Sequence, residues 1–130
     1  MSYSVKSESI LIVEDEPVIC EICMQVLKKE GYEVEIAANG QEGADRLKRK
    51  GYDLIIIDMR TPIMDGRQLY LKIRKDHPDM TGRVIMTSGE LAGGDMQSFM
   101  EKYGIPFLPK PFTSEDLRKA VRDALEGKSK

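Results

Sequence analysis

Residues 54–58, Leu-Ile-Ile-Ile-Asp, decide the fold of this 130-residue chain. Four large apolar residues in a row, without polar alternation, are typical of a strand that is covered on both faces of a parallel sheet. Similar runs lie at residues 10–13 and 84–86, and residues 107–108 form a weaker one. A fifth strand is predicted around residues 32–36, where apolar residues alternate with glutamates, so it should lie nearer a sheet edge.

Segments with the 3.6-residue periodicity of helices separate these strands. The predicted helices are residues 17–30, 41–50, 66–75, 95–103 and 114–125. The last helix has Thr113 as a candidate N-terminal cap with Asp116 three residues later, and Leu117, Val121 and Leu125 share one face. Because strand and helix alternate five times, the sequence predicts a three-layer α/β/α sandwich around a parallel sheet.

The composition fits one folded domain, which we predict over residues 9–126, with tails at residues 1–8 and 127–130. Hydrophobic residues make up 41% of the chain, enough for a core, and the net charge of −2 argues against nucleic acid as a direct partner. No apolar run approaches the roughly 18 residues of a membrane span, and the N-terminus lacks the apolar stretch of a secretory signal. We therefore expect a cytoplasmic protein without a membrane partner.

Cys20 and Cys23 have the spacing of a redox or zinc motif. A structural zinc ion needs four ligands, and His77 is the one other soft or nitrogen ligand in the chain. The two cysteines also lie within an amphipathic run rather than at the start of a helix after a strand. We interpret them as core or near-core helix residues.

Polar residues follow four of the predicted strands directly. They are Glu14, Asp15 and Glu16 after the first strand, Asp58 after residues 54–57, Thr87 and Ser88 after residues 84–86, and Lys110 after residues 107–108. In an open parallel α/β sheet, sites form beyond the carboxyl ends of the strands, so these side chains should converge on one edge. Each alone is explained by a cap, a turn or a solvated charge, but four such residues at four strand ends are not.

The chemistry of this set points to phosphoryl transfer. Carboxylates held close together repel one another unless a cation compensates them, and hard oxygen ligands favour Mg²⁺. A metal, a hydroxyl and a lysine together neutralise the oxygens of a phosphoryl group in flight. Asp58 is the acid attached most directly to a buried strand, so we predict that it is the nucleophile that forms an aspartyl phosphate.

Four stretches in this order resemble the receiver domain of two-component response regulators. They are ILIVEDEP at residues 10–17, LIIIDMRTPIMDG at 54–66, IMTS at 85–88 and FLPKPF at 107–112. The likeness extends from about residue 9 to residue 125. Each motif alone is weak, but the ordered set is specific.

The resemblance implies a flavodoxin-like, doubly wound sheet of five parallel strands in the order 2-1-3-4-5, with five helices. Asp58 would accept a phosphoryl group from the phosphohistidine of a sensor histidine kinase or a histidine phosphotransfer protein. Asp15, Asp58 and the backbone carbonyl of Arg60 would ligate Mg²⁺, and Glu14 would act through a bound water. Thr87 and Lys110 would contact the phosphoryl group, and the Lys110–Pro111 peptide would be cis.

The family likeness also implies a conformational switch as output. Thr87 would move toward the new anion, and a buried aromatic residue, here Phe107, would follow into the vacated space. The surface that changes would comprise the helix at residues 95–103, the strand at 107–108 and the helix at 114–125. The effector is unknown, and a phosphorylation-dependent homodimer is one expected form. Such a protein catalyses its own phosphorylation and dephosphorylation and is not a turnover enzyme on separate substrates.

Several residues depart from the family pattern, but none of the departures removes a reactive group. Glu14 replaces the more usual Asp, Thr61 replaces Met and Phe107 lacks the hydroxyl of Tyr; Arg60 lies near enough to Asp58 to alter the lifetime of the phosphoryl group. A haloacid-dehalogenase-type phosphatase would need an acid at Arg60, and a flavin binder would need a glycine- and hydroxyl-rich loop after the first strand. A pseudo-receiver used as a binding module, and a receiver belonging to a hybrid histidine kinase or a larger regulator, also stay open.

Overall fold

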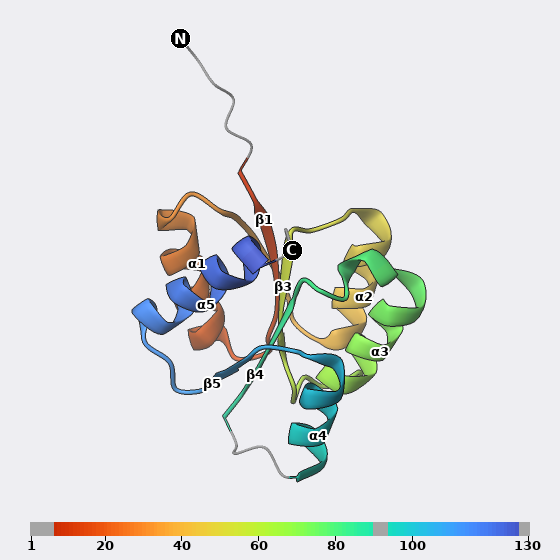
Figure 1. Ribbon diagram of the computed structural model, residues 1–130. Coiled ribbons are helices and arrows are strands. Elements are labelled where there is room, and N and C mark those ends of the chain that lie inside the picture. Colours follow the sequence, from red (N-terminus) through yellow and green to blue (C-terminus); the bar gives the residue numbers. More distant parts are fainter. Residues whose placement is uncertain (1–6, 90–93, 128–130) are drawn as a thin grey trace.

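A computed structural model describes residues 7–89 and 94–127 of the protein. The strands are β1 (Ser9–Val13), β2 (Glu33–Ala37), β3 (Leu54–Asp58), β4 (Val84–Ser88) and β5 (Phe107–Pro109). The helices are α1 (Pro17–Lys29), α2 (Gly40–Arg49), α3 (Gly66–Asp76), α4 (Gly94–Tyr103) and α5 (Ser114–Gly127), with a 3₁₀ turn, η1 (Pro78–Met80), after α3 (Figure 1). The predicted helices are confirmed within two residues at each end, whereas η1 was not predicted.

The five strands form one parallel sheet in the order β2-β1-β3-β4-β5, which confirms the flavodoxin-like topology. β2 lies at one edge, and its half-buried pattern agrees with the alternation in its sequence. β3 lies in the middle and is buried along its whole length. The apolar run at residues 54–57 is therefore part of the central strand of the sheet.

Side chains of the central strands alternate between two apolar cores, as the pleat of a strand requires. Leu11 and Ile55 face a core shared with α2 and α3, whereas Ile12 and Ile56 face a core shared with α1 and α5. Figure 1 shows these two pairs of helices on opposite sides of the sheet. Both faces are covered, and this explains why the strands carry no polar alternation.

Local signals fix the ends of the helices where the sequence predicted them. The side-chain hydroxyl of Thr113 accepts a hydrogen bond from the backbone N–H of Asp116 at 3.0 Å, and the Asp116 carboxylate accepts one from the N–H of Thr113. Asp65 and Gln68 form the same reciprocal box at the start of α3. These caps satisfy backbone groups that the first helical turn leaves unpaired, and they begin α3 and α5 directly after the loops that carry candidate site residues.

The cysteine interpretation agrees with the structure. Cys20 and Cys23 are both free, Cys23 is buried in the core beneath α1, and burial raises the pKa of its thiol to about 12. Such a thiol stays protonated and unreactive at neutral pH.

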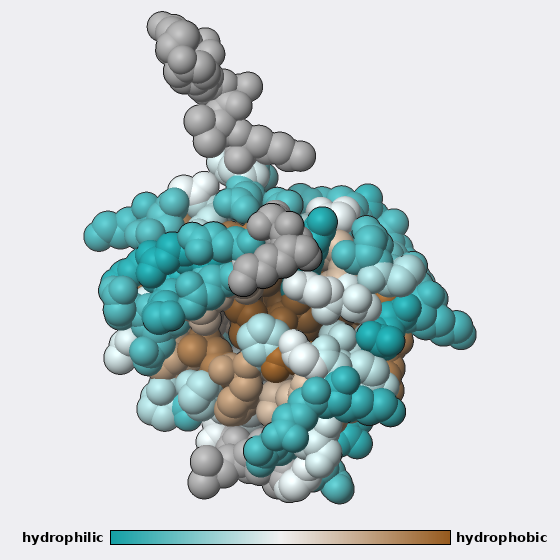
Figure 2. All heavy atoms as spheres, viewed as in Figure 1, coloured by the Kyte–Doolittle hydropathy of each residue, from teal (hydrophilic) through white to brown (hydrophobic). Residues whose placement is uncertain are grey.

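The surface is hydrophilic over the outer helices, and hydrophobic surface is visible between them, where β4 and β5 lie in Figure 1 (Figure 2). Among the described residues, no helix combines the length and the apolar character that crossing a bilayer requires. The predicted tails fall largely on residues 1–6 and 128–130, which lie outside the described part of the chain.

Candidate functional site

Four of the predicted polar residues, Glu14, Asp58, Thr87 and Lys110, lie at the carboxyl edge of the sheet because neighbouring strands end in register. Asp58 on β3 is paired with Thr87 on β4, and Ser88 is paired with Pro109 on β5. Val13 on β1 is paired with Ile57, so Glu14, the next residue, lies beside Asp58. The Lys110–Pro111 peptide that follows β5 is cis, as the family resemblance implied.

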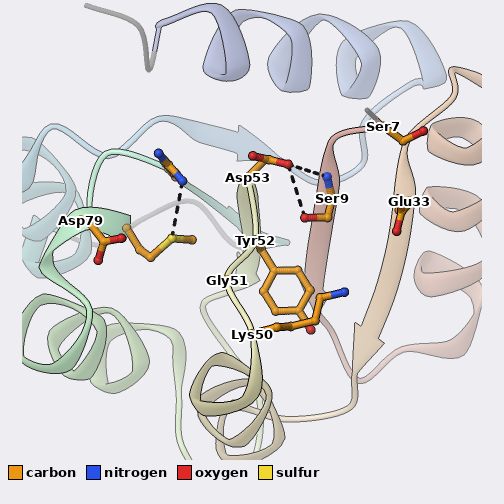
Figure 3. A pocket seen from close by; sticks show the side chains of 10 residues that line it. Ser7, Ser9, Glu33, Lys50, Gly51, Tyr52, Asp53 and Asp79 are labelled. Atoms are coloured by element: carbon orange, nitrogen blue, oxygen red, sulfur yellow. Dashed lines mark hydrogen bonds between the residues drawn. The ribbon is translucent and has the colours of Figure 1, made fainter. Parts of the chain in front are cut away.

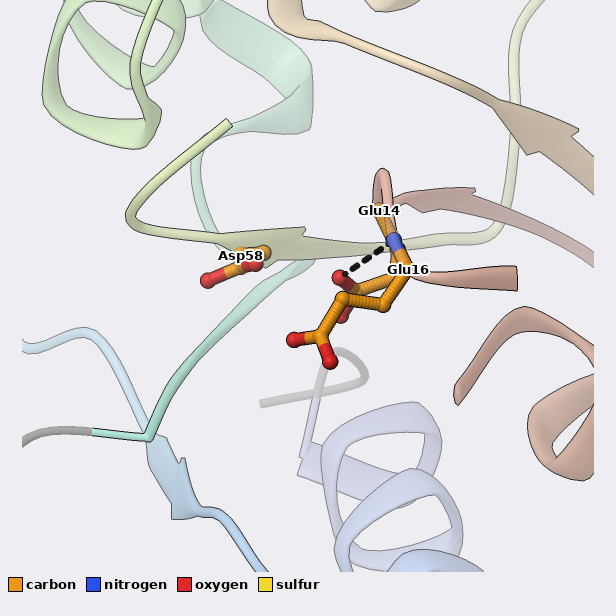
Figure 4. A group of neighbouring side chains, drawn as sticks. All are labelled: Glu14, Glu16 and Asp58. Carbon is orange, nitrogen blue, oxygen red and sulfur yellow. Dashed lines mark hydrogen bonds between the residues drawn. The ribbon is translucent and has the colours of Figure 1, made fainter. Parts of the chain in front are cut away.

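Lys110 joins three carboxylates into what we call the acidic pocket, which consists of Glu14, Glu16, Asp58 and Lys110. The ammonium of Lys110 lies 2.8 Å from Glu14, 3.2 Å from Glu16 and 3.3 Å from Asp58. Figure 4 shows the carboxylates of Glu14 and Glu16 on the side of β1 that faces Asp58. When all are ionised, the three acids and one ammonium leave two negative charges uncompensated.

Burial gives the acidic pocket its electrostatic character. Glu14 is 2% exposed, and its desolvation, aided by the charge of Asp58, raises its pKa to about 7 although Lys110 acts against this rise. Burial disfavours the charged form of Lys110, but its close contact with Glu14 and the charges of Asp58 and Glu14 outweigh burial and raise its pKa. At neutral pH Lys110 is therefore charged, and Glu14 is near the midpoint of its titration.

The carboxylates gathered here differ in one member from the predicted metal ligands. Within the described ranges, the carboxylate oxygens that lie within 4.8 Å of one another belong to Glu14, Glu16 and Asp58, and not to Asp15. Glu14 is buried, whereas Asp15 and Glu16 are both exposed, and the carboxylate of Glu16 reaches Lys110 at 3.2 Å. The role of Asp15 as a metal ligand stays a prediction, and Glu16 is a pocket residue for which no metal-binding role was predicted.

The side-chain hydroxyl of Thr87 is the polar group that best indicates what the site binds. Its side chain is 3% exposed, and its Oγ1 has no hydrogen-bond partner. Over residues 7–89 and 94–127, the other buried side-chain polar atom without a hydrogen bond is Oε1 of Glu14, which has only the ion pair with Lys110. Buried hydroxyls normally form a hydrogen bond, so the unpaired hydroxyl of Thr87 beside Asp58 is available to donate to an acceptor that binds there.

The loop after β3 is held tightly around Asp58. One carboxylate oxygen of Asp58 accepts a hydrogen bond from the backbone N–H of Arg60 at 3.2 Å. The buried hydroxyl of Thr61 donates to the carbonyl of Met64 at 2.7 Å. A Cβ atom at Gly40 would collide with that same carbonyl, so this glycine lets α2 approach the loop. The side chain of Arg60 is exposed, and whether it affects a phosphoryl group stays a prediction.

Phe107 corrects one expectation, because it is 36% exposed rather than buried. β5 is an edge strand of three residues, and of these only Leu108 is buried, where it joins the core that α5 covers. With a side-chain period of two, Phe107 and Leu108 cannot both face the core. Sequence alone could not decide which of two adjacent apolar residues points inward.

The acidic pocket has the donor set of a hard divalent cation. Three carboxylates supply oxygen ligands from two neighbouring strand ends, and the excess negative charge favours a cation beyond Lys110. Mg²⁺ typically uses one or two protein carboxylates and keeps positions for water or phosphate oxygens. The residues present therefore fit a Mg²⁺ site, with Glu14, Glu16 and Asp58 as its candidate ligands.

A cavity of about 400 Å³ lies at the opposite, amino edge of the sheet (Figure 3). Asp53 lines it and accepts hydrogen bonds from the backbone and the hydroxyl of Ser9. The remaining lining residues are Ser7, Glu33, Lys50, Gly51, Tyr52, Asp79, Met80 and Arg83. This cavity contains none of the predicted site residues.

Comparison with known proteins identifies the family. The model of the response regulator receiver domain matches residues 10–122. The chain is 38% identical to sporulation initiation phosphotransferase F of Bacillus subtilis, over 95% of this chain and 98% of that protein. A receiver domain protein (CheY-like) from Methanospirillum hungatei JF-1 has a similar crystal structure, with a TM-score of 0.87, 32% identity and coverage of 95% of this chain and 98% of that one.

Other relatives are longer than this chain. It is 35% identical to the transcriptional regulatory protein GlrR of Escherichia coli over 93% of its own length but only 27% of that protein. It covers 13% of the sensor kinase CckA of Brucella abortus, to which it is 33% identical. The likeness is thus to one domain that occurs both alone and within larger proteins. With this family match, the topology and the acidic pocket, the chain belongs to the response regulator receiver domain family.

Proposed function

We propose that this receiver domain accepts a phosphoryl group on Asp58 from the phosphohistidine of a sensor histidine kinase or a histidine phosphotransfer protein. The observation that carries the proposal is the orphaned hydroxyl of Thr87, which lies in register with Asp58 and has no structural partner. Lys110, 3.3 Å from Asp58, supplies the matching positive charge. A carboxylate between an unused donor and a cation is suited to form an anionic ester.

The residues around Asp58 would have different roles in the transfer. A carboxylate oxygen of Asp58 attacks phosphorus, the O–P bond forms, and the N–P bond breaks with its electron pair leaving on the imidazole. The hydrogen bond from the Arg60 N–H fixes the orientation of the Asp58 carboxylate. Thr87 donates its hydroxyl to one phosphoryl oxygen, and Lys110 pairs with another, so both neutralise charge on the transferred group.

Mg²⁺ bound among the pocket carboxylates would supply further neutralisation of the phosphoryl oxygens and would offset repulsion between Asp58 and Glu14. Glu14 and Asp58 would hold it from adjacent strands. The family resemblance assigns Asp15 as a further ligand, and a carboxylate oxygen of Glu16 lies within 4.8 Å of those of Glu14 and Asp58. Lys110 would then give up part of its contact with Glu14.

The change of shape that signals to an effector would follow from the same contacts. A phosphoryl group that draws Thr87 inward opens space beside β4, and Phe107, which is exposed on β5 in this structure, would turn into it. The exposed orientation is the starting state that such a switch requires. The surface formed by α4, β5 and α5 would change shape and bind an effector or a second copy of the chain. Which protein it contacts depends on whether this domain acts alone or within a larger regulator or hybrid kinase.

Intact mass spectrometry after incubation with acetyl phosphate tests the proposal. With Mg²⁺ we expect a gain of about 80 Da, the mass of one phosphoryl group on an aspartate. Without Mg²⁺ the gain should fall sharply, and in Asp58→Ala it should vanish. A wild-type protein that shows no Mg²⁺-dependent gain would refute the phosphoacceptor function and favour a pseudo-receiver.

Asp79→Ala is the matched control for this experiment. Asp79 is an exposed aspartate on η1 and lines the cavity at the amino edge, so its loss should leave the labelling unchanged. Reduced labelling in both variants would mean that the carboxylates act through general stability rather than as an acceptor.

A further inference from the structure

Ile63, in the loop between β3 and α3, combines two unfavourable features. Its φ is 72°, in the left-handed region, and among the described non-glycine residues it alone has a positive φ. Its side chain is 79% exposed. A β-branched residue is a marked outlier in this conformation, and glycine or asparagine would adopt it at lower cost.

The surrounding loop fixes this conformation. Thr61 donates its hydroxyl to the carbonyl of Met64, and the N–H of Met64 donates to the carbonyl of Pro62 at 2.7 Å. The N–H of Gly66 donates to the carbonyl of Met59, where α3 begins. These bonds use backbone groups and Thr61 but nothing of the Ile63 side chain. The isoleucine therefore adds strain and an exposed apolar surface without contributing to the core.

The position of Ile63 indicates what its side chain meets. The loop starts at Asp58, and a protein that transfers a phosphoryl group must bring its phosphohistidine into direct contact with that carboxylate. The donor's surface must then cover the rim of the pocket, including this loop. Val18 is 68% exposed and lies in the first turn of α1, which covers the face of the sheet opposite to α3 (Figure 1). An approaching protein therefore meets exposed apolar side chains from both flanks.

We propose that Ile63 is an apolar docking residue for the phosphohistidine-bearing protein, which would bury it against an apolar surface beside its histidine. This inference rests on the proposed function and adds the partner contact to it. Strained residues that a fold does not need for its own packing are concentrated at functional sites. A small donor such as acetyl phosphate has no surface to offer Ile63, so the side chain should matter only for a protein donor.

The test compares two donors on the same variants. One donor is acetyl phosphate, and the other is a radiolabelled histidine phosphotransfer protein, chosen beforehand because it transfers label to the wild-type chain. For Ile63→Gly we expect the ratio of the protein-donor rate to the acetyl phosphate rate to fall by about tenfold or more at subsaturating donor, as burial of such a side chain predicts. Ile63→Leu, which keeps an apolar side chain, should retain a ratio within about threefold of wild type.

Two further measurements separate docking from stability and from the chemistry. Ile63→Gly should raise the urea midpoint, because it removes the strain, so loss of transfer from a more stable protein cannot be due to unfolding. Leu71→Ala, at an apolar residue of α3 that is 42% exposed, should leave the rate ratio unchanged. An unchanged ratio in Ile63→Gly would overturn the docking role. Failure of the wild type to accept label from acetyl phosphate would instead count against the proposed function.

Discussion

Two glutamates of this domain each lie beside a lysine, yet their pKa values move in opposite directions. Burial and the neighbouring Asp58 raise the pKa of Glu14 to about 7, although Lys110 is 2.8 Å away. Hydrogen bonds from Lys50 and Tyr52 lower the pKa of Glu35 on β2. The two glutamates differ in the number of acids and donors around them, not in the presence of a lysine.

We call the second region the Glu35 cluster, which consists of Glu35, Arg46, Lys50 and Tyr52. Arg46 lies 2.9 Å and Lys50 2.6 Å from the Glu35 carboxylate, and the hydroxyl of Tyr52 donates to it at 2.7 Å. Figure 3 shows Lys50 and Tyr52 side by side at the cavity of the amino edge. One acid is shared by three donors, whereas in the acidic pocket three acids share one.

The difference separates a structural cluster from a reactive site. The Glu35 cluster connects α2 with β2 by ion pairs. Its charged groups compensate one another, so it needs no ligand to balance them. The acidic pocket retains excess negative charge, and the adjacent hydroxyl of Thr87 has no hydrogen-bond partner. Both are unfavourable in the free protein and become favourable when a cation and a phosphoryl group bind. The uncompensated charge lowers the stability of the free protein, and for the same reason a bound cation or phosphoryl group stabilises it.

Replacing the lysine in each region should give the largest difference in the free energy of unfolding between the two regions. Lys110→Met removes the one cation of the acidic pocket, and we expect the free energy of unfolding at pH 8, without divalent cations, to fall by about 3 kcal/mol. Lys50→Met removes one of two cations, and its side chain is 44% exposed, so we expect a loss below about 1 kcal/mol. Urea denaturation followed by circular dichroism measures both values.

The pH dependence is the internal control for the lysine pair. At pH 6 the Lys110→Met protein should recover part of its loss, because Glu14 then takes up a proton and relieves the repulsion. Lys50→Met should show no such recovery. Equal losses in the two variants at both pH values would mean that the regions do not differ in their charge balance.

The second expected effect is the opposite response of the two glutamates to pH. Because the pKa of Glu14 is raised from 4.5 to about 7, its charge costs folding energy that grows as pH rises from 4.5 to 7 and is constant above. Relative to wild type, Glu14→Gln should therefore gain about 2 kcal/mol of stability between pH 5 and pH 8. Denaturant midpoints across this range, without divalent cations, give the difference.

Glu35→Gln should follow the opposite sign. A lowered pKa means that ionised Glu35 stabilises the fold above about pH 4.5, and that this contribution is lost as pH falls through its folded pKa. The variant should be less stable than wild type at neutral pH and should approach it in acid. A Glu14→Gln protein that also lost stability relative to wild type as pH rose would show that Lys110 dominates Glu14.

The fold was predictable from sequence because its signals are local and repeated. The buried run that forms β3 and the helix caps at Thr113 and Asp65 depend on neighbours in the chain, and the alternation of strand and helix leaves few topologies. The site was predictable for a related reason. Asp58 ends β3, Thr87 is the last residue but one of β4 and Lys110 directly follows β5. Parallel strands carry such residues to one edge whatever the details of packing.

What the sequence did not predict concerns orientation, which depends on contacts distant in sequence. Glu16 contacts Lys110 although no role was predicted for it, and the exposure of Phe107 follows from the register of an edge strand. The left-handed backbone of Ile63 has no signal in its residue type, since isoleucine disfavours it. In each case the residues were in view in the sequence, but the direction of the side chain or backbone was set by the assembled sheet.

The smallest expected effect compares two buried threonine hydroxyls of the same sheet edge. Thr87 is 3% exposed without a hydrogen-bond partner, whereas Thr61 is 5% exposed and donates to the carbonyl of Met64. Thr87→Val removes only an unsatisfied group, so it should keep or raise stability, by up to about 1 kcal/mol, while it slows labelling by acetyl phosphate about tenfold or more. Thr61→Val breaks a bond and should cost about 1 kcal/mol. Destabilisation of Thr87→Val by as much as Thr61→Val would show that the Thr87 hydroxyl already serves the fold, and the acidic pocket would then lose the feature that most distinguishes it from the Glu35 cluster.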